Sequence, residues 1–532
     1  MAATLSVLTV LSRLPYRARM LYNWDAVQFA LALQEYDVAK HQPHPPGYVL
    51  YVGLGRLIDA WLNDPPAAYV VLAVLFSGLT TFVVYYLALA IYGRATALAA
   101  AALLAVSPLF WFYGSVGLTY AGEALGASTV AYFAFRSLRG SRHYAWIGAA
   151  CLGLVGGLRQ SILVLLLPLW LGSAAIGPRR ARVVAVGLAL LTLAVLSWAL
   201  PMIWLTGGLE RYLTASADLV AEVITPTSVM AGRLETTLRV SRHLLESVLV
   251  GLGPLALAAG LVPWYIRRHG WREREWFLLG WAATPVAVYT LVHFGQPGYV
   301  LTFLPALVIF LSHVLITALA GAQGAAHSRR RAVVAIAAVV VIVLVNGAFF
   351  VSARPTTRDF ERAEPGWARM AEEDLSDRVL SHTAAALREH EAVLQTYVRA
   401  IRGLYRPDDT LLITELGNPR SYPWLRHGMY YLPEYPIYEL QSGDRPPGFY
   451  APRLARAMSR TPGATIVVPS TVRQLVWFVD HWNPGVERPA GLQEITLPHG
   501  RYIYTLPVRR LPMRYAGYTF VADTPRGGRA ER

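Results

Sequence analysis

Long apolar runs fill the first two thirds of the chain and restrict what it can fold into. A helix crosses a bilayer with about 20 consecutive apolar residues. Ten runs of about this length follow one another, after a shorter one at the start. Only 15% of the 532 residues are charged, against about 25% in soluble domains. We therefore predict an α-helical polytopic membrane protein with about eleven spans, at residues 1–12, 67–92, 95–113, 118–135, 144–158, 162–177, 184–205, 246–266, 277–292, 300–319 and 333–352.

The arginines between these spans predict the orientation of the chain, because short cytoplasmic loops are enriched in basic residues. They occur in alternate loops, around residues 94, 136–142, 179–182, 267–274 and 329–331. The loops 114–117 and 293–299 contain no basic residue, and Arg159 is alone in its turn. This pattern places the first residue in the cytoplasm and, with an odd number of spans, everything after residue 353 outside. We expect a location in a prokaryotic cytoplasmic membrane.

The net charge of +15 comes almost wholly from arginine, because Lys40 is the only lysine. Either a GC-rich genome or an anionic partner explains this bias. Because the arginines follow the predicted topology and do not gather on one domain face, we predict no nucleic-acid partner. The chain has no phosphate-binding loop of the nucleotide-dependent kind, which argues against an ATP-driven transporter.

The composition divides the chain into a membrane domain at 1–353, with long outer loops at 13–66 and 206–245, and a soluble α/β domain at 354–523. A helical stretch is predicted from residue 358 to about 404. Strands are predicted at 410–416, 464–469 and 501–506, where β-branched and aromatic residues are bounded by Pro, Gly and Asn. Residues 524–532, rich in Gly and Arg, are predicted to be a disordered tail.

The first outer loop carries a lone carboxylate, Asp25, and the rigid segment His44-Pro-Pro-Gly-Tyr48. Residues 26–39 have apolar side chains at helical spacing, and a helical pattern resumes from residue 48 to 62. Asp25 is therefore either an N-terminal cap of the first helix or a functional acid. Prolines stiffen the segment that follows, so the loop is predicted to be a shaped surface.

The Asp25 and His44-Pro-Pro-Gly-Tyr48-x-Leu-Tyr51 arrangement resembles the GT-C superfamily of membrane glycosyltransferases, in particular the domain-of-unknown-function proteins related to protein O-mannosyltransferases. In topology the resemblance covers residues 1–353, whereas the specific motif covers only residues 24–56. It implies that Asp25 is the catalytic base and that the sugar arrives on a polyprenyl phosphate. In relatives a second acid often follows the first, whereas Ala26 follows here, so the resemblance identifies no metal ligand.

Three further positions at the outer ends of spans are candidate substrate-binding residues. Arg159, in a Gly-rich turn, is a candidate for binding the leaving phosphate, or else extends its charge to the membrane interface. Glu123 is either a second acid or a structural partner of Arg159. The turn His293-Phe-Gly-Gln296-Pro-Gly-Tyr299 offers a ring, an amide and a phenol to a sugar, or is an ordinary turn. With His44 and Tyr48, these residues complete the predicted binding set.

We predict a glycosyltransferase that moves a sugar from a polyprenyl-phosphate donor to a protein, lipid or glycan acceptor at the outer face, with inversion. No cofactor and no zinc site are predicted, although a divalent metal stays open. The aromatic stretch after Glu415 suits acceptor recognition or docking on the membrane. The alternatives are a flippase for lipid-linked saccharides, which would line a path at several depths of the bilayer, and a scaffold of envelope assembly.

Overall fold

The computed structural model describes residues 1–176, 180–225, 228–229, 232, 234–320, 328–354, 380–416, 424–441, 457–460 and 465–523. Contacts divide the chain into two compact units. The helical unit contains Met1–Met20 and the described residues between Pro45 and Arg388. The α/β unit contains Leu21–His44 and the described residues from Glu389 onward.

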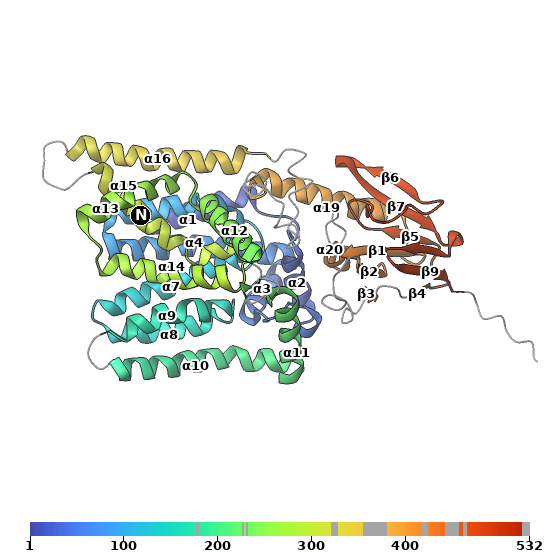
Figure 1. Ribbon diagram of the computed structural model, residues 1–532, viewed down its shortest axis with the longest axis horizontal. Coiled ribbons are helices and arrows are strands. Elements are labelled where there is room, and N and C mark those ends of the chain that lie inside the picture. The colour runs from blue at the N-terminus through green and yellow to red at the C-terminus, as the bar shows by residue number, and fades with distance from the viewer. Residues whose placement is uncertain are drawn as a thin grey trace, which may run out of the picture. The chain divides into compact units, whose positions relative to one another are not determined.

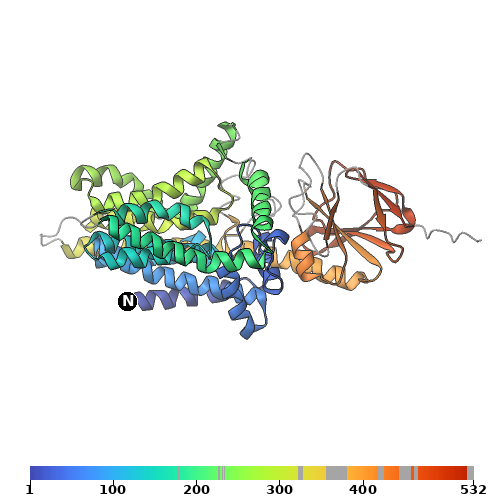
Figure 2. The ribbon, with the colours of Figure 1, turned by 90° about the horizontal axis from the view of Figure 1, so that it is seen from below.

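Most helices of the helical unit run alongside one another, as Figures 1 and 2 show. Their bounds follow from local signals; Asp64, for example, caps α4 by accepting a hydrogen bond from Ala67 N at 3.1 Å, with Pro65 next in the chain. The α-helices are α1 (Ala2–Arg13), α3 (Val49–Leu62), α4 (Pro65–Tyr92), α5 (Arg94–Ala105), α6 (Pro108–Tyr113), α7 (Tyr120–Leu138), α8 (Arg142–Val155), α9 (Ser161–Ala174), α10 (Arg180–Leu205), α11 (Leu209–Leu219), α12 (Leu234–Leu252), α13 (Val262–His269), α14 (Glu273–Leu291), α15 (Leu304–Ala320) and α16 (Ser328–Ser352). Shorter helical turns are η1 (Leu14–Tyr16), η3 (Val220–Ile224), η6 (Gly253–Leu261) and η7 (Pro297–Thr302).

Each predicted span coincides with one helix or with consecutive helices, which confirms a polytopic helical fold. The run 95–113 is divided between α5 and α6, because Pro108 starts a new helix there. The run 246–266 continues from α12 through η6 into α13. By length and composition, four described helices are able to cross a membrane, at Pro65–Tyr92, Arg180–Leu205, Leu234–His269 and Arg330–Ser352. The number of crossings stays a prediction.

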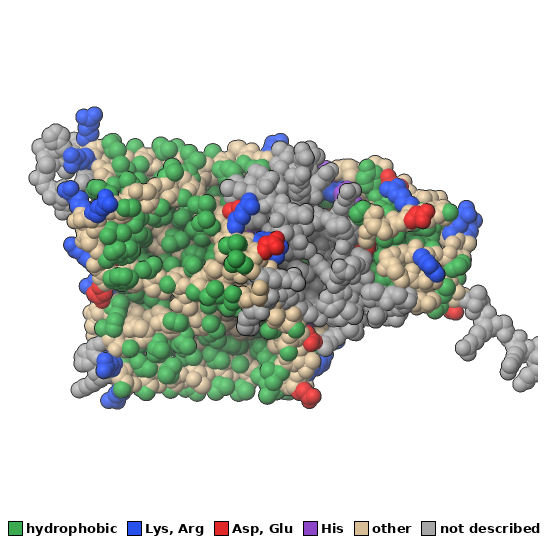
Figure 3. All heavy atoms as spheres, in the orientation of Figure 1, with side chains coloured by type: hydrophobic (Ala, Val, Ile, Leu, Met, Phe, Trp, Pro, Cys, Tyr) green, Lys and Arg blue, Asp and Glu red, His purple; other side chains and the backbone are tan. Residues whose placement is uncertain are grey.

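The surface of the helical unit separates apolar from basic side chains. Hydrophobic side chains cover its middle, and Lys and Arg side chains gather at one end, as Figure 3 shows. The N-terminus lies toward that end, as Figure 1 shows, and Arg94 Nη2 is 2.9 Å from Met1 Sδ. This arrangement agrees with alternate arginine-rich loops on one side of a bilayer. Residues 177–179 lie outside the described residues, and the side facing the cytoplasm stays a prediction.

The α/β unit is built on a mixed sheet of order β3-β2-β1-β5-β7-β6 and a smaller sheet of order β4-β9-β8. In the larger sheet β1 is parallel to β2 and β5, with Leu412 opposite Ile437, whereas β7 is antiparallel to β5 and β6. Side chains of both sheets share one core, which includes Leu411, Trp477 and Phe520. The strands are β1 (Thr410–Leu416), β2 (Ile437–Gln441), β3 (Ala457–Arg460), β4 (Thr465–Val468), β5 (Gln474–Trp477), β6 (Gln493–Leu497), β7 (Arg501–Pro507), β8 (Met513–Tyr515) and β9 (Tyr518–Ala522).

The helices of this unit include a segment from the first outer loop. They are α2 (Trp24–Gln34), η2 (Val38–Lys40), α20 (Leu425–Tyr431), α19 (Ala384–Leu404) from Glu389 onward, η9 (Pro498–Gly500) and η10 (Val508–Arg510). The predicted domains placed all of 13–66 with the membrane part, whereas Leu21–His44 groups with the α/β unit. The physical reason is that α2 packs against α20, whose side chains bind the backbone of this segment.

The secondary structure predicted for the soluble domain is confirmed where the residues are described. The strands expected at 410–416, 464–469 and 501–506 are β1, β4 and β7. The helix expected to end near residue 404 is α19. Its predicted beginning, at residues 358–379, and the predicted tail at 524–532 lie outside the described residues.

Candidate functional site

Asp25 lies in the first turn of α2 but does not cap the helix. The cap is Asn23, whose Oδ1 accepts a hydrogen bond from the Ala26 N–H at 3.0 Å. The prediction that Asp25 serves as the cap is therefore wrong, and the alternative of a functional acid stands. The helix is also shorter than expected, because it ends at Gln34 and the backbone turns extended at Glu35.

In the α/β unit the carboxylate of Asp25 faces the imidazole of His44. Asp25 Oδ1 lies 3.8 Å from His44 Nδ1, and the two side chains are 27% and 15% exposed. The ring of Phe29, one turn further along α2, lies 5.7 Å from that of His44. The carboxylate is thus held beside a ring while part of it stays open to solvent. Such a group is able to accept a proton from a hydroxyl that approaches it.

The segment that follows is shaped by its backbone, as the prolines predicted. Asp37 and Gln42 exchange two backbone hydrogen bonds, at 2.6 and 3.0 Å, that close a small loop. His41 and Tyr48 have left-handed backbones, with φ of 56° and 45°, which is uncommon for side chains other than Gly and is often seen at functional sites. Tyr48 and the α3 helix that it precedes belong to the helical unit.

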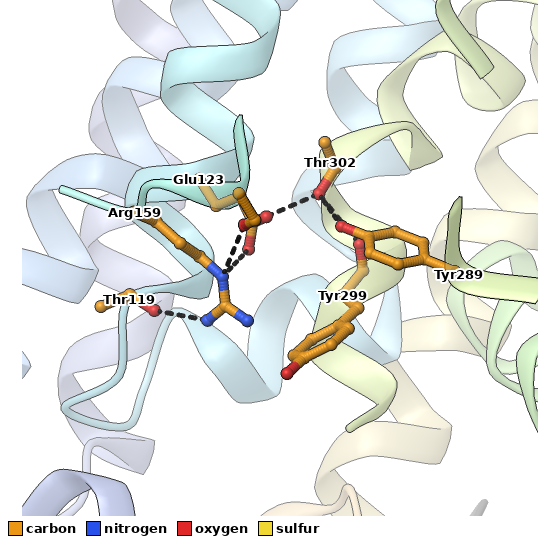
Figure 4. Close-up of polar contacts among 7 residues, drawn as sticks. Thr119, Glu123, Arg159, Tyr289, Tyr299 and Thr302 are labelled. Carbon is orange, nitrogen blue, oxygen red and sulfur yellow. Dashed lines mark hydrogen bonds and ion pairs between the residues drawn. The ribbon is translucent and has the colours of Figure 1, made fainter. Parts of the chain in front are cut away.

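Arg159 is the centre of a buried polar cluster in the helical unit, drawn in Figure 4. It lies in the turn between α8 and α9, and its Nε is 3.3 Å from Glu123 Oε2. Its Nη1 donates to Thr119 Oγ1 at 3.0 Å, and its Nε to Ser161 Oγ at 3.3 Å. The side chain of Glu123 is 0% exposed and that of Arg159 is 10% exposed. The structure therefore pairs Glu123 with Arg159, which agrees with one of the two interpretations of Glu123.

Three tyrosine rings surround the guanidinium of Arg159. Its central carbon is 4.5 Å from the ring centre of Tyr299, 4.9 Å from that of Tyr120 and 6.0 Å from that of Tyr48. Ring faces attract a cation, and more strongly where water is excluded. The rings thus hold a positive charge in place without neutralising it.

A second layer of side chains fixes Glu123. Its Oε1 accepts a hydrogen bond from Thr302 Oγ1 at 2.8 Å, and the hydroxyl of Tyr289 lies 2.9 Å from the same Thr302 oxygen. Figure 4 shows how Tyr289 and Thr302 approach the carboxylate from the side away from Arg159. Neither residue was predicted from the sequence. The only signal for Thr302 was its place three residues after Tyr299, and Tyr289 lay inside a predicted span.

The predicted turn at 293–299 contributes unequally to this cluster. Tyr299 faces Arg159, and the ring of His293 lies 6.0 Å from that of Tyr299. Burial and the charge of Arg159 lower the pKa of His293 to about 4, so its ring is neutral at pH 7. Gln296 precedes η7, and its backbone oxygen accepts the Tyr299 N–H at 3.1 Å.

Glu415 has structural partners in the α/β unit. It is buried in β1, accepts a 2.6 Å hydrogen bond from the Tyr515 hydroxyl and is bonded by the Asn483 amide. Residues 417–423 of the predicted aromatic stretch lie outside the described residues. Trp424, which follows them, is buried and stacks on Phe478 at 5.7 Å. This ring packs the interior and is not an exposed surface for a sugar.

The described part of the chain contains no group of three His, Cys, Asp or Glu side chains placed to hold a metal ion. The polar residues that the geometry offers are the Asp25–His44 pair in the α/β unit and the Arg159–Glu123 cluster in the helical unit.

Comparisons with known proteins agree with the fold. No family model matches the chain, and no curated protein matches it by sequence. Among solved structures, ArnT from Cupriavidus metallidurans bound to undecaprenyl phosphate superposes with a TM-score of 0.56 at 13% identity, over 95% of this chain and 97% of that one. The apo state of the same protein gives 0.54 at 15% identity, over 94% and 97%. The apo oligosaccharyltransferase of Archaeoglobus fulgidus gives 0.50 at 13% identity, over 90% and 69%. These neighbours are GT-C membrane glycosyltransferases. The chain therefore has the GT-C fold, and the motif of its first outer loop stays a prediction.

Proposed function

We propose that this integral membrane protein is a glycosyltransferase that moves a sugar from a polyprenyl-phosphate donor to an acceptor hydroxyl at the outer face of the membrane. The acceptor belongs to a protein, a lipid or a glycan. The observation that carries the proposal is the fold shared with ArnT over nearly the full length of both chains, because that protein was captured with undecaprenyl phosphate bound. The residues around Asp25 and Arg159 supply groups that such a transfer requires.

Asp25 is the proposed base. The acceptor hydroxyl oxygen attacks the anomeric carbon as the bond from that carbon to the phosphate oxygen breaks. The proton of the hydroxyl passes to the Asp25 carboxylate, and the bonding electron pair leaves with the polyprenyl phosphate. A phosphate leaves without being protonated, so one carboxylate suffices. Attack opposite the phosphate inverts the anomeric centre, as in inverting glycosidases. His44, 3.8 Å from Asp25, is proposed to orient the carboxylate.

Arg159 is the proposed binder of the phosphate. A guanidinium presents several donors in a plane and matches phosphate oxygens well. Glu123 and Thr119 hold one side of this guanidinium, and the tyrosine rings hold it against its faces. A cation fixed in this way stabilises charge that develops on the leaving group without reorganising during the reaction. His293, Gln296, Tyr48 and Tyr299 are proposed to line the same end of the helical unit for the donor.

One observation favours the flippase alternative. Helix α14 carries a buried polar group near each end, Tyr289 beside Glu123 and Glu275 about 21 Å away at 1.5 Å per residue. Polar groups at two depths are what a saccharide path requires. However, Glu275 accepts hydrogen bonds from Tyr265 at 2.8 Å, Tyr92 at 3.1 Å and Arg274 at 2.9 Å. A carboxylate bonded this fully supports a structural role more than a transport role.

The test is sugar transfer from radiolabelled polyprenyl-phosphate sugars to endogenous acceptors in membranes that contain the native chain or Asp25→Asn. Asp64→Asn is the matched control, because Asp64 is an exposed carboxylate of the same outer loop and Asn caps α4 as well as Asp does. We expect transfer by the native and Asp64→Asn proteins and none by a normally inserted Asp25→Asn protein. Full transfer by Asp25→Asn would contradict the base assignment. No transfer from any donor by the native protein would favour the flippase.

A further inference from the structure

Helix α20 lies between the larger sheet and the loop segment that carries Asp25, all within the α/β unit. On one side it packs closely on β2, because a Cβ added to Gly428 would meet Ile437 Cδ1 at 2.8 Å. On the other side it packs against α2. Helix α20 therefore connects the sheet to the segment Leu21–His44, so the position of the segment depends on the position of the sheet.

Side chains of α20 hold both ends of that segment through backbone atoms. The Leu21 N–H donates to the Tyr431 hydroxyl at 2.8 Å, and the Leu21 carbonyl oxygen is 3.2 Å from His427 Nε2. At the other end, Arg426 Nη2 donates to the carbonyl oxygen of Lys40 at 3.4 Å. These contacts bind backbone atoms before and after α2. They therefore fix the position of the helix independently of its own side chains.

Arg426 also touches the residue next to the proposed base. Its guanidinium carbon is 5.6 Å from the ring centre of Trp24, which precedes Asp25. The Arg426 side chain is fully buried, and burying a guanidinium is costly unless its contacts repay the cost. The buried carboxyl of Glu439, on β2, is the acid whose titration Arg426 influences. A long charged side chain of α20 therefore reaches both the Trp24 ring and the Lys40 carbonyl.

We propose that Arg426 and His427 are positioning residues, which hold the segment Leu21–Lys40 so that Asp25 is presented for proton transfer. This inference rests on the proposed function and extends it, because it makes the α/β unit part of the catalytic apparatus. Neither residue touches the reacting atoms. Their loss is expected to lower the rate of the chemical step and to leave acceptor binding nearly unchanged, because a misplaced catalytic group costs rate even when substrate binds.

Lys40 provides a readout that does not depend on activity. It is the only lysine in the chain, so a lysine-specific endoprotease cleaves only the Lys40–His41 bond. The carbonyl of that bond is the one that Arg426 binds. Cleavage requires the segment to leave α20, and its rate reports how often the segment does so.

The experiment compares Arg426→Met and Tyr431→Phe with the native full-length protein in detergent, using Arg488→Met as the matched control. Arg488 is an exposed arginine of the same unit that pairs with Glu494 at 2.7 Å. Tyr431→Phe removes only the hydroxyl that binds Leu21 and keeps the ring, so it provides a variant that folds if Arg426→Met does not. For Arg426→Met we expect cleavage at Lys40 at least tenfold faster and kcat at least tenfold lower, with KM changed less than threefold. For Tyr431→Phe we expect about threefold effects in the same directions, and for Arg488→Met none.

The outcomes separate this inference from the proposed function. Faster cleavage with unchanged kcat would overturn the positioning role, and so would a lower kcat with unchanged cleavage. Partial recovery of both quantities toward native values in Arg426→Gln would support it, because glutamine keeps hydrogen-bond donors and adds no second lysine for the protease. If Asp25→Asn keeps full transfer, the proposed base is wrong, whatever the cleavage rates are.

Discussion

Arg159 and Glu123 form an ion pair inside the helical unit, with Arg159 Nε 3.3 Å from Glu123 Oε2. Glu123 lies in the first turn of α7, and Arg159 lies in the turn between α8 and α9. The carboxylate of Glu123 is fully buried. Buried ion pairs contribute little net stability, but breaking one of them is costly because it leaves a charge unpaired. The pair is therefore better explained by what it holds in place than by the stability it adds.

We predict that Arg159→Met lowers stability and that adding Glu123→Gln restores part of it. The single change leaves the Glu123 carboxylate buried without its cation, at a cost of about 3–5 kcal/mol. The double change removes both charges, while the amide oxygen introduced by Glu123→Gln still accepts from Thr302. Thermal unfolding of the four proteins in detergent gives the coupling between the two sites.

Sugar transfer by the same four proteins separates stability from function. We expect none from either variant that lacks Arg159, including the stabler double one, because the phosphate has lost its cation. Transfer that recovers together with stability would mean that Arg159 only supports the fold.

A second prediction concerns the start of α2, where Asn23 and Asp25 have different tasks. Asn23→Ala removes the cap and is expected to cost about 1 kcal/mol, with transfer reduced only in proportion to the folded fraction. Asp25→Asn keeps the cap and is expected to abolish transfer with an unchanged unfolding temperature. Equal losses of stability in the two variants would indicate that Asp25 supports the helix end after all.

Much of the helical fold could be predicted because apolar runs of bilayer length are visible in the amino-acid sequence itself. The same holds for β1, whose run of β-branched and apolar residues at Thr410–Leu416 is bounded as expected. The end of α2 at Gln34 was harder to predict, because the apolar pattern continues beyond it. Only the extended backbone of Glu35 shows that the helix ends there. The Asn immediately before Trp24 was a capping signal that could have been used.

The parts that could not be predicted depend on contacts between distant residues. Thr302 meets Glu123 only once η7 is packed beside α7, and Tyr289, on α14, joins them only through Thr302. Likewise Arg426 is a charged residue in an aromatic stretch, and nothing local shows that it is buried against Trp24. The grouping of Leu21–His44 with the α/β unit follows from such contacts, so a boundary drawn from composition places this segment with its sequence neighbours instead.

A third prediction uses the close approach of η7 to Tyr120. A Cβ added at Gly298 would lie 2.5 Å from the Tyr120 ring, and that ring lies beside Arg159. Gly298→Ala is therefore expected to displace the ring and lower transfer about tenfold, as a small misplacement near a catalytic group does. Gly280→Ala on α14 is the control, because its Cβ would meet nothing within 4 Å. An unchanged rate in Gly298→Ala would show that the ring position does not matter.

The last prediction is a pH dependence of stability that originates at Glu439. Burial raises the pKa of this carboxyl from 4.5 to about 8, and the nearby charge of Arg426 opposes the shift. Between pH 4.5 and 8 the folded state therefore holds a proton that the unfolded state has lost. Stability falls as pH rises through this window. Since one unit of pKa shift corresponds to about 1.4 kcal/mol, a shift from 4.5 to about 8 corresponds to a total loss on the order of 5 kcal/mol.

Glu439→Gln removes this dependence, because the amide stays neutral at every pH. We expect the native protein and the variant to unfold at nearly the same temperature at about pH 5, where both side chains are neutral in the fold. At about pH 9 the native protein is expected to unfold at the lower temperature. Comparing the two proteins at each pH cancels the titration of the other groups. If the native protein instead gained stability relative to the variant as pH rose, Glu439 would be ionised in the folded state. The raised pKa of its carboxyl would then be contradicted.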